Sequence, residues 1–206
     1  MSTAAVSCAV LLPVKPPGRG KSRLSDVSAQ LRTALASAFA LDTAAAALAT
    51  DGVTAVLAVT DDHRFASELA QLGCAVVPDG VSGDLNGSLV QAAAEATRRW
   101  PGTRPVALTA DLPCLRADDL AAVLASLPDD AAFVRDAAGT GTSLYSAPLG
   151  RFAPRFGADS AKRHLDLGAV ELHAAASVRR DVDAPSDLTA ALALGVGPRT
   201  TAALGQ

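Results

Sequence analysis

The chain has 206 residues, of which 50% are hydrophobic and 19% are charged, so it can bury a sizeable core. Its formal net charge of -3 lacks the basic excess of proteins that track a phosphate backbone, which argues against nucleic acid as a partner. The three cysteines, Cys8, Cys74 and Cys114, lie far apart in the sequence. We expect them to be core or strand-end residues in a reducing environment, not disulfide partners or zinc ligands.

Two apolar stretches could be mistaken for targeting or membrane segments. The first, residues 6–14, has no basic residue before it and is interrupted by Pro13, which argues against a signal peptide. The second, residues 33–50, is half alanine and contains Asp42, which favours a buried amphipathic helix over a membrane span. We therefore expect a cytoplasmic protein with no membrane partner.

Apolar runs of strand length alternate with helical segments through the first part of the chain. The predicted strands are residues 6–14, 54–60, 74–78 and 104–110, and the predicted helices are residues 28–49, 61–73, 86–100 and 116–127. Such near-continuous apolar runs are typical of parallel strands that are covered on both faces. The pattern predicts an α/β fold with three layers, α/β/α, around a mostly parallel sheet.

The pattern changes after residue 127. Strands at residues 131–137 and 141–148 follow each other without a long helix, which predicts an antiparallel insertion at about residues 131–157. A helix at 157–168, a strand at 169–176 and a helix at 184–195 complete the prediction, and the tail 197–206 is expected to fray. We see no internal repeat or linker, so a single domain over residues 1–206 is predicted.

The loop after the first strand, "KPPGRGKSR", contains a tripeptide, residues 20–22, that resembles the end of a phosphate-binding P-loop. That motif requires a glycine where Lys15 stands, and the two prolines that follow remove N–H groups from a cradle built of N–H groups. We favour a different polyphosphate site, made by four cations with two glycines that allow close approach: Lys15, Arg19, Lys21, Arg23, Gly18 and Gly20. A solvated basic turn is the alternative.

Carboxylates follow two later strands. Asp111 stands in a turn stiffened by Pro113 and can bind a divalent cation that bridges phosphates, although an Asx-turn or helix cap is the alternative. In "RRDVDAP", we expect Asp181 and Asp183 to point to opposite faces, so that only one of them faces the cleft. Asp187 lies in the first turn of the last helix, where the helix dipole explains it.

Six segments in order closely resemble one family: "PVKPPGRGKSRL", "DLNGSL", "TADLP", "GTGTSLY", "FGADSAKRH" and "DVDAPSDL". They are similar to the 2-phospho-L-lactate and phosphoenolpyruvate guanylyltransferases, which make the activated intermediate for the deazaflavin coenzyme F(420). The resemblance covers about residues 6–195. It implies a Rossmann-like nucleotidyltransferase fold, similar to that of the nucleotide-diphospho-sugar transferases, and transfer of GMP from GTP to phosphoenolpyruvate or 2-phospho-L-lactate.

The resemblance also implies roles for individual residues. It assigns the triphosphate to the basic loop, Mg2+ to Asp111 and Asp183, and Lys21, Arg23 and Asp111 to catalysis. Asn86 would lie near the base or ribose, and Thr142, Gly157 and Ser160 would hold the acceptor. Ordinary structural roles are the alternatives: a helix N-cap for Asn86, a helix cap for Ser160 or Asp159, a turn glycine for Gly157 and a hairpin position for Thr142. For His164, on the same helical face as Ser160, we expect a structural or substrate-orienting role and not acid–base catalysis.

The implied chemistry agrees with the absence of an evident nucleophile–base pair. The attacking group is an ionised phosphate, so catalysis reduces to alignment and charge neutralisation. A triphosphate of about -4 and an acceptor of about -3 are offset by two Mg2+ ions and four basic side chains, roughly +8. The product would pass to a downstream transferase, and a homodimer is compatible with the resemblance. The alternatives are a nucleotidyltransferase for molybdopterin or a sugar phosphate, and a non-catalytic nucleotide-binding module.

Overall fold

The structure is a computed structural model that describes residues 7–16, 18, 24, 27–81 and 83–205. Its centre is a seven-stranded sheet with the order β3-β2-β1-β4-β6-β5-β7. The strands are β1 (Cys8–Pro13), β2 (Val53–Val59), β3 (Ala75–Val77), β4 (Arg104–Leu108), β5 (Ala132–Arg135), β6 (Thr142–Ser146) and β7 (Val170–Glu171). Among these described strands, β6 alone runs antiparallel to its neighbours. The mostly parallel sheet and the antiparallel insertion are confirmed.

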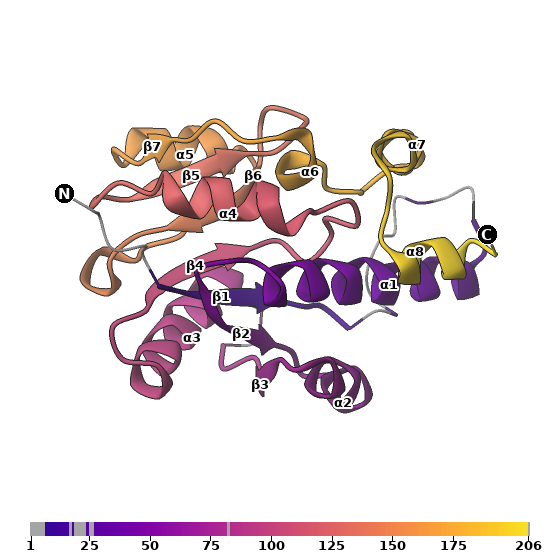
Figure 1. Ribbon diagram of the computed structural model, residues 1–206, viewed down its shortest axis with the longest axis horizontal. Coiled ribbons are helices and arrows are strands. Elements are labelled where there is room, and N and C mark those ends of the chain that lie inside the picture. The colour runs from indigo at the N-terminus through magenta and orange to yellow at the C-terminus, as the bar shows by residue number, and fades with distance from the viewer. Residues whose placement is uncertain (1–6, 17, 19–23, 25–26, 82, 206) are drawn as a thin grey trace.

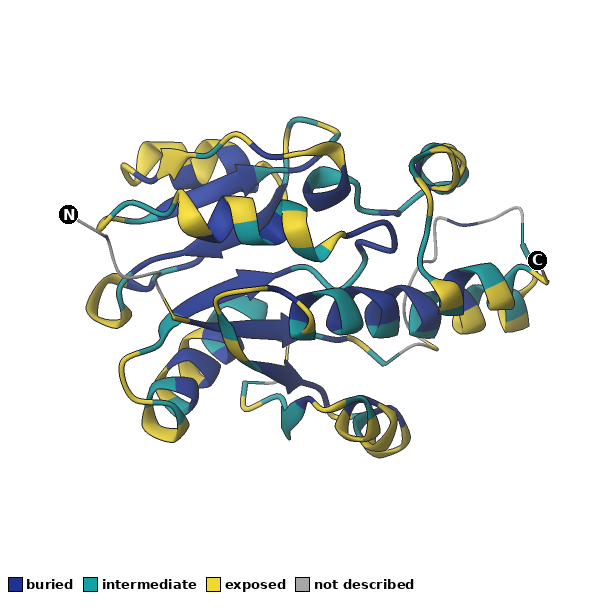
Figure 2. Cartoon of the chain, viewed as in Figure 1, coloured by how far each residue is buried: buried dark blue, intermediate teal, exposed yellow. Residues whose placement is uncertain are grey.

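Helices cover both faces of this sheet (Figure 1). They are α1 (Ala29–Leu48), α2 (His63–Leu72), α3 (Leu85–Arg99), α4 (Ala117–Ala125), α5 (Ser160–Asp166), α6 (Ala176–Arg179), α7 (Pro185–Leu194) and α8 (Pro198–Ala203), with a short 3-10 helix at Leu149–Arg151. Figure 2 shows buried strands between helices whose outward faces are exposed. The predicted three-layer α/β/α architecture is therefore confirmed.

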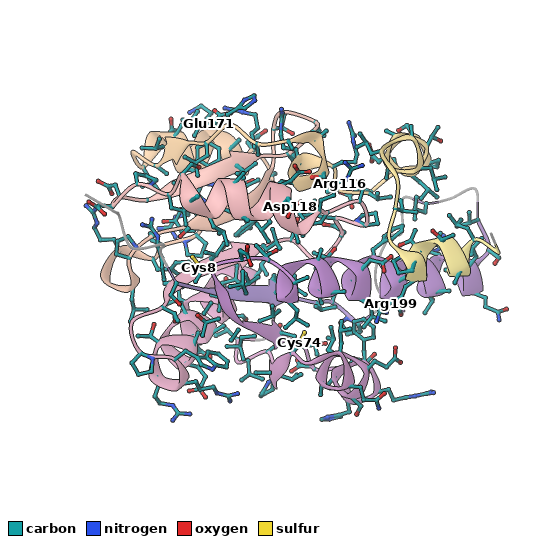
Figure 3. The ribbon with its side chains drawn as sticks, in the orientation of Figure 1. Cys8, Cys74, Arg116, Asp118, Glu171 and Arg199 are labelled. Atoms are coloured by element: carbon teal, nitrogen blue, oxygen red, sulfur yellow. The ribbon has the colours of Figure 1, made fainter. Side chains whose placement is uncertain are left out.

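Strand β1 shows how the sequence builds two cores. Cys8, Val10 and Leu12 pack under α1, α2 and α4, whereas Ala9 and Leu11 pack under α3 and α5. Successive strand side chains point to opposite faces, so an uninterrupted apolar run is needed where both faces are covered. Burial raises the pKa of the Cys8 and Cys74 thiols to about 11, so both are protonated core residues (Figure 3).

Helix α1 is, of the helices that the structure describes, the one long and apolar enough to cross a membrane by length and composition. It instead packs on the sheet and buries residues such as Leu35, Phe39 and Ala44. This agrees with the buried helix predicted at residues 33–50.

The strand predicted at residues 169–176 is much shorter in the structure. Only Val170 and Glu171 pair with β5, and both are exposed at the outer edge of the sheet. The chain then enters α6, which buries Ser177 and Val178. An edge position gives little burial to extend the strand, whereas the short helix brings Val178 into the core.

The tail expected to fray at residues 197–206 instead contains α8, which lies beside α1 (Figure 1). The buried carboxylate of Asp42 on α1 accepts hydrogen bonds from the backbone N–H groups of Arg199, at 3.1 Å, and Thr200, at 2.8 Å. Gly197 leaves room for this carboxylate, since a Cβ there would lie 2.3 Å from the Asp42 Cγ. The prediction was wrong because the group that caps α8 is 157 residues away in the sequence.

Replacing Asp42 with alanine is expected to lower the free energy of unfolding by about 1.5–3 kcal/mol, because hydrogen bonds from two backbone groups to a charged acceptor are lost. Asp51→Ala, at an exposed position just after α1, is the matched control. Urea denaturation of both variants measures the difference. A loss no larger than that of the control would show that the Asp42 contact does not hold α8.

Candidate active site

The predicted site residues of the strands gather at one edge of the sheet. Lys15 follows β1 and Asp111 follows β4, and parallel strands place their carboxyl ends on the same side. Thr142 begins β6, which runs antiparallel, so it lies at this edge as well. Lys15 and Gly18 are exposed there, whereas Arg19, Gly20, Lys21 and Arg23 lie outside the described residues.

Asp111 is placed by two contacts to the peptide group that joins it to Leu112. The buried hydroxyl of Thr43 on α1 accepts a hydrogen bond from the Leu112 N–H at 3.1 Å and donates one to the Phe39 carbonyl at 2.8 Å. The Asp111 carbonyl accepts a hydrogen bond from the Val182 N–H at 3.1 Å. These contacts fix the turn after β4 and bring it against residues 181–183.

The structure therefore groups carboxylates that are far apart in the sequence. The pKa of Asp181 is raised to about 7, first by burial and then by the negative charges of Asp111, Asp136 and Asp183. The prediction that Asp181 and Asp183 point to opposite faces was wrong. The rule behind that prediction was misapplied, because residues two apart in a strand share a face, and the residue between them, Val182, is fully buried. Asp181 is thus part of the same acidic cluster.

Asp136 is a member of this cluster that was not predicted. Its carboxylate accepts hydrogen bonds from the N–H groups of Gly139, Thr140 and Gly141 at 2.7, 3.1 and 2.9 Å, and so shapes the turn between β5 and β6. Gly141 must lack a side chain, because a Cβ would lie 2.1 Å from the Asp136 Oδ2. A signal was available in the sequence, since Asp136 follows β5 as directly as polar residues follow β1 and β4.

The acidic cluster is chemically suited to a cation, although not to a closed metal cage. The negative charges around Asp181 help to raise its pKa because like charges repel, and a divalent cation relieves that repulsion. Within the described part of the chain, no three His, Cys, Asp or Glu side chains form a group that could hold a metal ion. Proteins usually bind Mg2+ through one or two carboxylates, and substrate phosphates complete the coordination of the ion. The residues of the acidic cluster fit this arrangement.

Beside the acidic cluster lies a buried polar network. The Ser160 hydroxyl donates to the Thr142 Oγ1 at 3.0 Å, and the His164 Nδ1 lies 3.0 Å from the same oxygen. The Arg155 N–H donates to the His164 Nε2 at 2.9 Å, so Nε2 carries no hydrogen and Nδ1 is the donor. All three side chains of the network are at least 94% buried, with exposed fractions of 6%, 1% and 0% for Thr142, Ser160 and His164.

The surroundings of His164 keep its ring neutral. Its pKa is lowered to about 4, first by burial and then by the positive charges of Arg155 and Arg163. Tyr145 stacks on the imidazole with centroids 4.7 Å apart, and the rings of Phe133 and Phe156 lie 5.4 and 5.8 Å away. A ring held in this way is suited to orienting its neighbours and unsuited to exchanging protons near neutral pH.

Asn86 joins the amino-terminal end of α3 to the segment before α5. Its Nδ2 donates to the Phe156 carbonyl at 3.1 Å, and its Oδ1 accepts from the Phe156 N–H at 2.8 Å. The N-cap of α3 is Asp84, so the alternative of Asn86 as a helix cap was wrong. Gly157 follows with a φ of 120°, a conformation that favours glycine. Asp159, not Ser160, occupies the N-cap of α5.

The family model described as "Guanylyl transferase CofC like" matches residues 8–204. A Streptomyces coelicolor protein named phosphoenolpyruvate guanylyltransferase is 52% identical over 94% of this chain and 93% of its own length. A Thermomonospora curvata protein of the same name is 47% identical, over 97% and 89%. The solved structure of a nucleotide-diphospho-sugar transferase from Desulfovibrio desulfuricans has a TM-score of 0.68 at 21% identity, over 89% of this chain and 85% of its own.

Proposed function

Because this chain belongs to the family of CofC-like guanylyl transferases, we propose that it transfers GMP from GTP to phosphoenolpyruvate. The products would be enolpyruvoyl-2-diphospho-5'-guanosine and diphosphate, an intermediate of deazaflavin coenzyme F(420) biosynthesis made in the cytoplasm and consumed by a further transferase. The observation that carries the proposal is the meeting of an acidic cluster and the Thr142–Ser160 pair at one sheet edge. A cation-bound triphosphate and a small phosphorylated acid would lie side by side there.

The reaction requires alignment more than proton transfer. An oxygen of the acceptor phosphate attacks the α-phosphorus of GTP, the bond from that phosphorus to the β-bridging oxygen breaks, and diphosphate leaves with the electron pair. The attacking oxygen is already ionised, so no side chain has to remove a proton. This is consistent with a buried histidine whose pKa is about 4.

We propose Asp111 and Asp183 as the ligands of Mg2+, with Asp181 as their acidic neighbour. Bound there, Mg2+ would supply charge neutralisation to the triphosphate and the leaving diphosphate. Asp187 is excluded from this role by its own contacts, because its Oδ2 accepts from the N–H groups of Asp183 and Ala184 at 3.2 and 2.8 Å. That carboxylate holds the start of α7, as its position in the first turn predicts.

We propose the basic loop as the triphosphate site, with Lys15, Gly18, Arg19, Gly20, Lys21 and Arg23 as its residues. Lys21→Ala is expected to weaken GTP binding by roughly ten- to a hundredfold, the loss of one charge-assisted contact. The control is Lys162→Ala, on the exposed side of α5, where Lys162 pairs with Asp166 at 2.6 Å. Isothermal calorimetry with GTP compares the two. Equal GTP affinity of Lys21→Ala and the parent would favour the alternative, in which the basic loop is a solvated turn that does not bind the triphosphate.

Release of diphosphate tests the function. The protein is incubated with GTP, Mg2+ and one acceptor at a time: phosphoenolpyruvate, 2-phospho-L-lactate, 3-phosphoglycerate, a sugar phosphate or molybdopterin. We expect phosphoenolpyruvate to give the highest kcat/KM. Preference for a sugar phosphate or molybdopterin would contradict the proposal, and GTP binding without diphosphate release would identify a nucleotide-binding module. Size-exclusion chromatography of the same sample tests the homodimer.

A further inference from the structure

Two side chains from different helices hold two consecutive residues of the segment before α5. Asn86 on α3 binds both the N–H and the carbonyl of Phe156. His164 on α5 accepts the N–H of Arg155 through its Nε2 at 2.9 Å. Gly157 comes next in the chain, so its backbone position is set by contacts to the two residues immediately before it.

We call these contacts of Asn86 and His164 to residues 155 and 156 the clamp. His164 also connects the clamp to Thr142 and Ser160, the other residues assigned to the phosphorylated acceptor. Its Nδ1–H points at the Thr142 Oγ1, which also receives the Ser160 hydroxyl. One neutral ring therefore connects the first residue of β6, the first turn of α5 and the segment 155–157. The buried Phe156 ring, 5.8 Å from the imidazole, closes the arrangement. Thr142, Gly157 and Ser160 belong to this network or adjoin it.

We propose that Asn86 and His164 are positioning residues for the acceptor and act on its binding, not on that of GTP. The inference rests on the proposed function, which assigns the acceptor to Thr142, Gly157 and Ser160. It differs from the role near the base or ribose that the family resemblance implies for Asn86. Each polar atom of the Asn86 amide is engaged by the Phe156 backbone, and that backbone leads directly into Gly157.

Three substitutions at His164 separate the two hydrogen bonds from the packing. His164→Phe keeps an aromatic ring among Phe133, Tyr145 and Phe156 but loses both bonds. His164→Asn can place an amide donor near the Nδ1 position, and His164→Gln can place an acceptor near the Nε2 position. Asn86→Ala removes the two hydrogen bonds between the Asn86 amide and the Phe156 backbone. The controls are His173→Phe and Gln71→Ala, both at exposed positions outside the site.

Steady-state kinetics with GTP and phosphoenolpyruvate is the first readout. Asn86→Ala and His164→Phe should each raise the KM for phosphoenolpyruvate by roughly ten- to a hundredfold, with a GTP dissociation constant close to that of the parent. His164→Asn or His164→Gln should recover part of the loss. The double variant Asn86→Ala/His164→Phe should lose less than the product of the single losses, because both residues hold the same segment. Both controls should behave like the parent.

Amide hydrogen exchange of Arg155 and Phe156, followed by NMR, is a readout that does not depend on turnover. Exchange should accelerate at Phe156 in Asn86→Ala and at Arg155 in His164→Phe, in variants whose urea denaturation shows that they fold. In the parent, nitrogen NMR of His164 should show a neutral ring protonated at Nδ1, with a pKa near 4.

The possible failures are distinguishable. If the parent releases no diphosphate with any acceptor, the proposed function is wrong, and so is the role of the clamp in binding the acceptor. A parent that is active, combined with Asn86→Ala or His164→Phe variants that lose GTP affinity and keep the KM for phosphoenolpyruvate, overturns the inference alone. Unchanged exchange at both amides overturns the clamp itself.

Discussion

Asp111→Asn is expected to lower kcat by roughly two to four orders of magnitude, with thermal unfolding close to that of the parent. Metal-assisted charge neutralisation is worth several kcal/mol, and each 1.36 kcal/mol corresponds to about tenfold in rate. The turn should survive the change, because its backbone is held by Thr43 and by the hydrogen bond from Val182. Loss of one negative charge also relieves the repulsion that raises the pKa of Asp181. Turnover should therefore fall while thermal stability stays close to that of the parent. We expect the same combination for Asp183→Asn.

Asp118→Asn is the matched control for this change. Asp118 is exposed in the first turn of α4, seven residues after Asp111 and outside the acidic cluster (Figure 3). The measurement is kcat over a titration with Mg2+ for the parent, Asp111→Asn, Asp183→Asn and the control. Near-parent turnover of Asp111→Asn or Asp183→Asn at low Mg2+ would remove that residue from the metal site.

Removal of both acceptor hydroxyls, in Thr142→Ala/Ser160→Ala, is expected to lower kcat/KM for phosphoenolpyruvate by roughly two to four orders of magnitude. Each hydroxyl that binds a charged acceptor contributes about 1.5–3 kcal/mol. The structure adds a second reason, since the two oxygens are 3.0 Å apart and Thr142 is a partner of the buried His164. GTP affinity should stay near that of the parent.

The control for the double variant is Ser67→Ala/Thr189→Ala. Both hydroxyls are exposed and bind carbonyls of their own helices, those of His63 and Pro185. Kinetics with varied phosphoenolpyruvate and calorimetry with GTP give the two constants separately. Lost GTP binding with an unchanged acceptor KM would mean that the two pockets have been assigned the wrong way round.

The fold was predictable where local pattern and tertiary structure agree. The apolar runs of β1 to β4 predict buried parallel strands because both faces of the sheet are covered. The elements that differ depend on distant partners. Helix α8 requires the carboxylate of Asp42, and β7 is short because its edge position leaves Val170 and Glu171 exposed.

The residues of the candidate site also fall into two groups, those whose positions follow from local pattern and those whose positions depend on distant partners. The place of Asp111 at the sheet edge of the candidate site could be predicted because the direction of a strand fixes the end at which its residues lie, whereas Thr142 was predicted through the family resemblance. The position of Asp181 beside Asp111 depends on contacts between segments about 70 residues apart, among them the hydrogen bond from the Val182 N–H to the Asp111 carbonyl. The pairing of Asn86 with Phe156 is likewise a contact between distant segments, which a single sequence does not display.

Phosphorus NMR of a reaction that contains the protein, GTP, phosphoenolpyruvate and Mg2+ tests the proposed transfer most directly. If GMP moves to the acceptor phosphate, the α-phosphorus of GTP and the phosphorus of phosphoenolpyruvate become a coupled pair in one asymmetric diphosphate. Free diphosphate should appear in equal amount, and neither product should form without phosphoenolpyruvate. Formation of GDP with orthophosphate, or diphosphate with an unchanged phosphoenolpyruvate signal, would contradict the transfer.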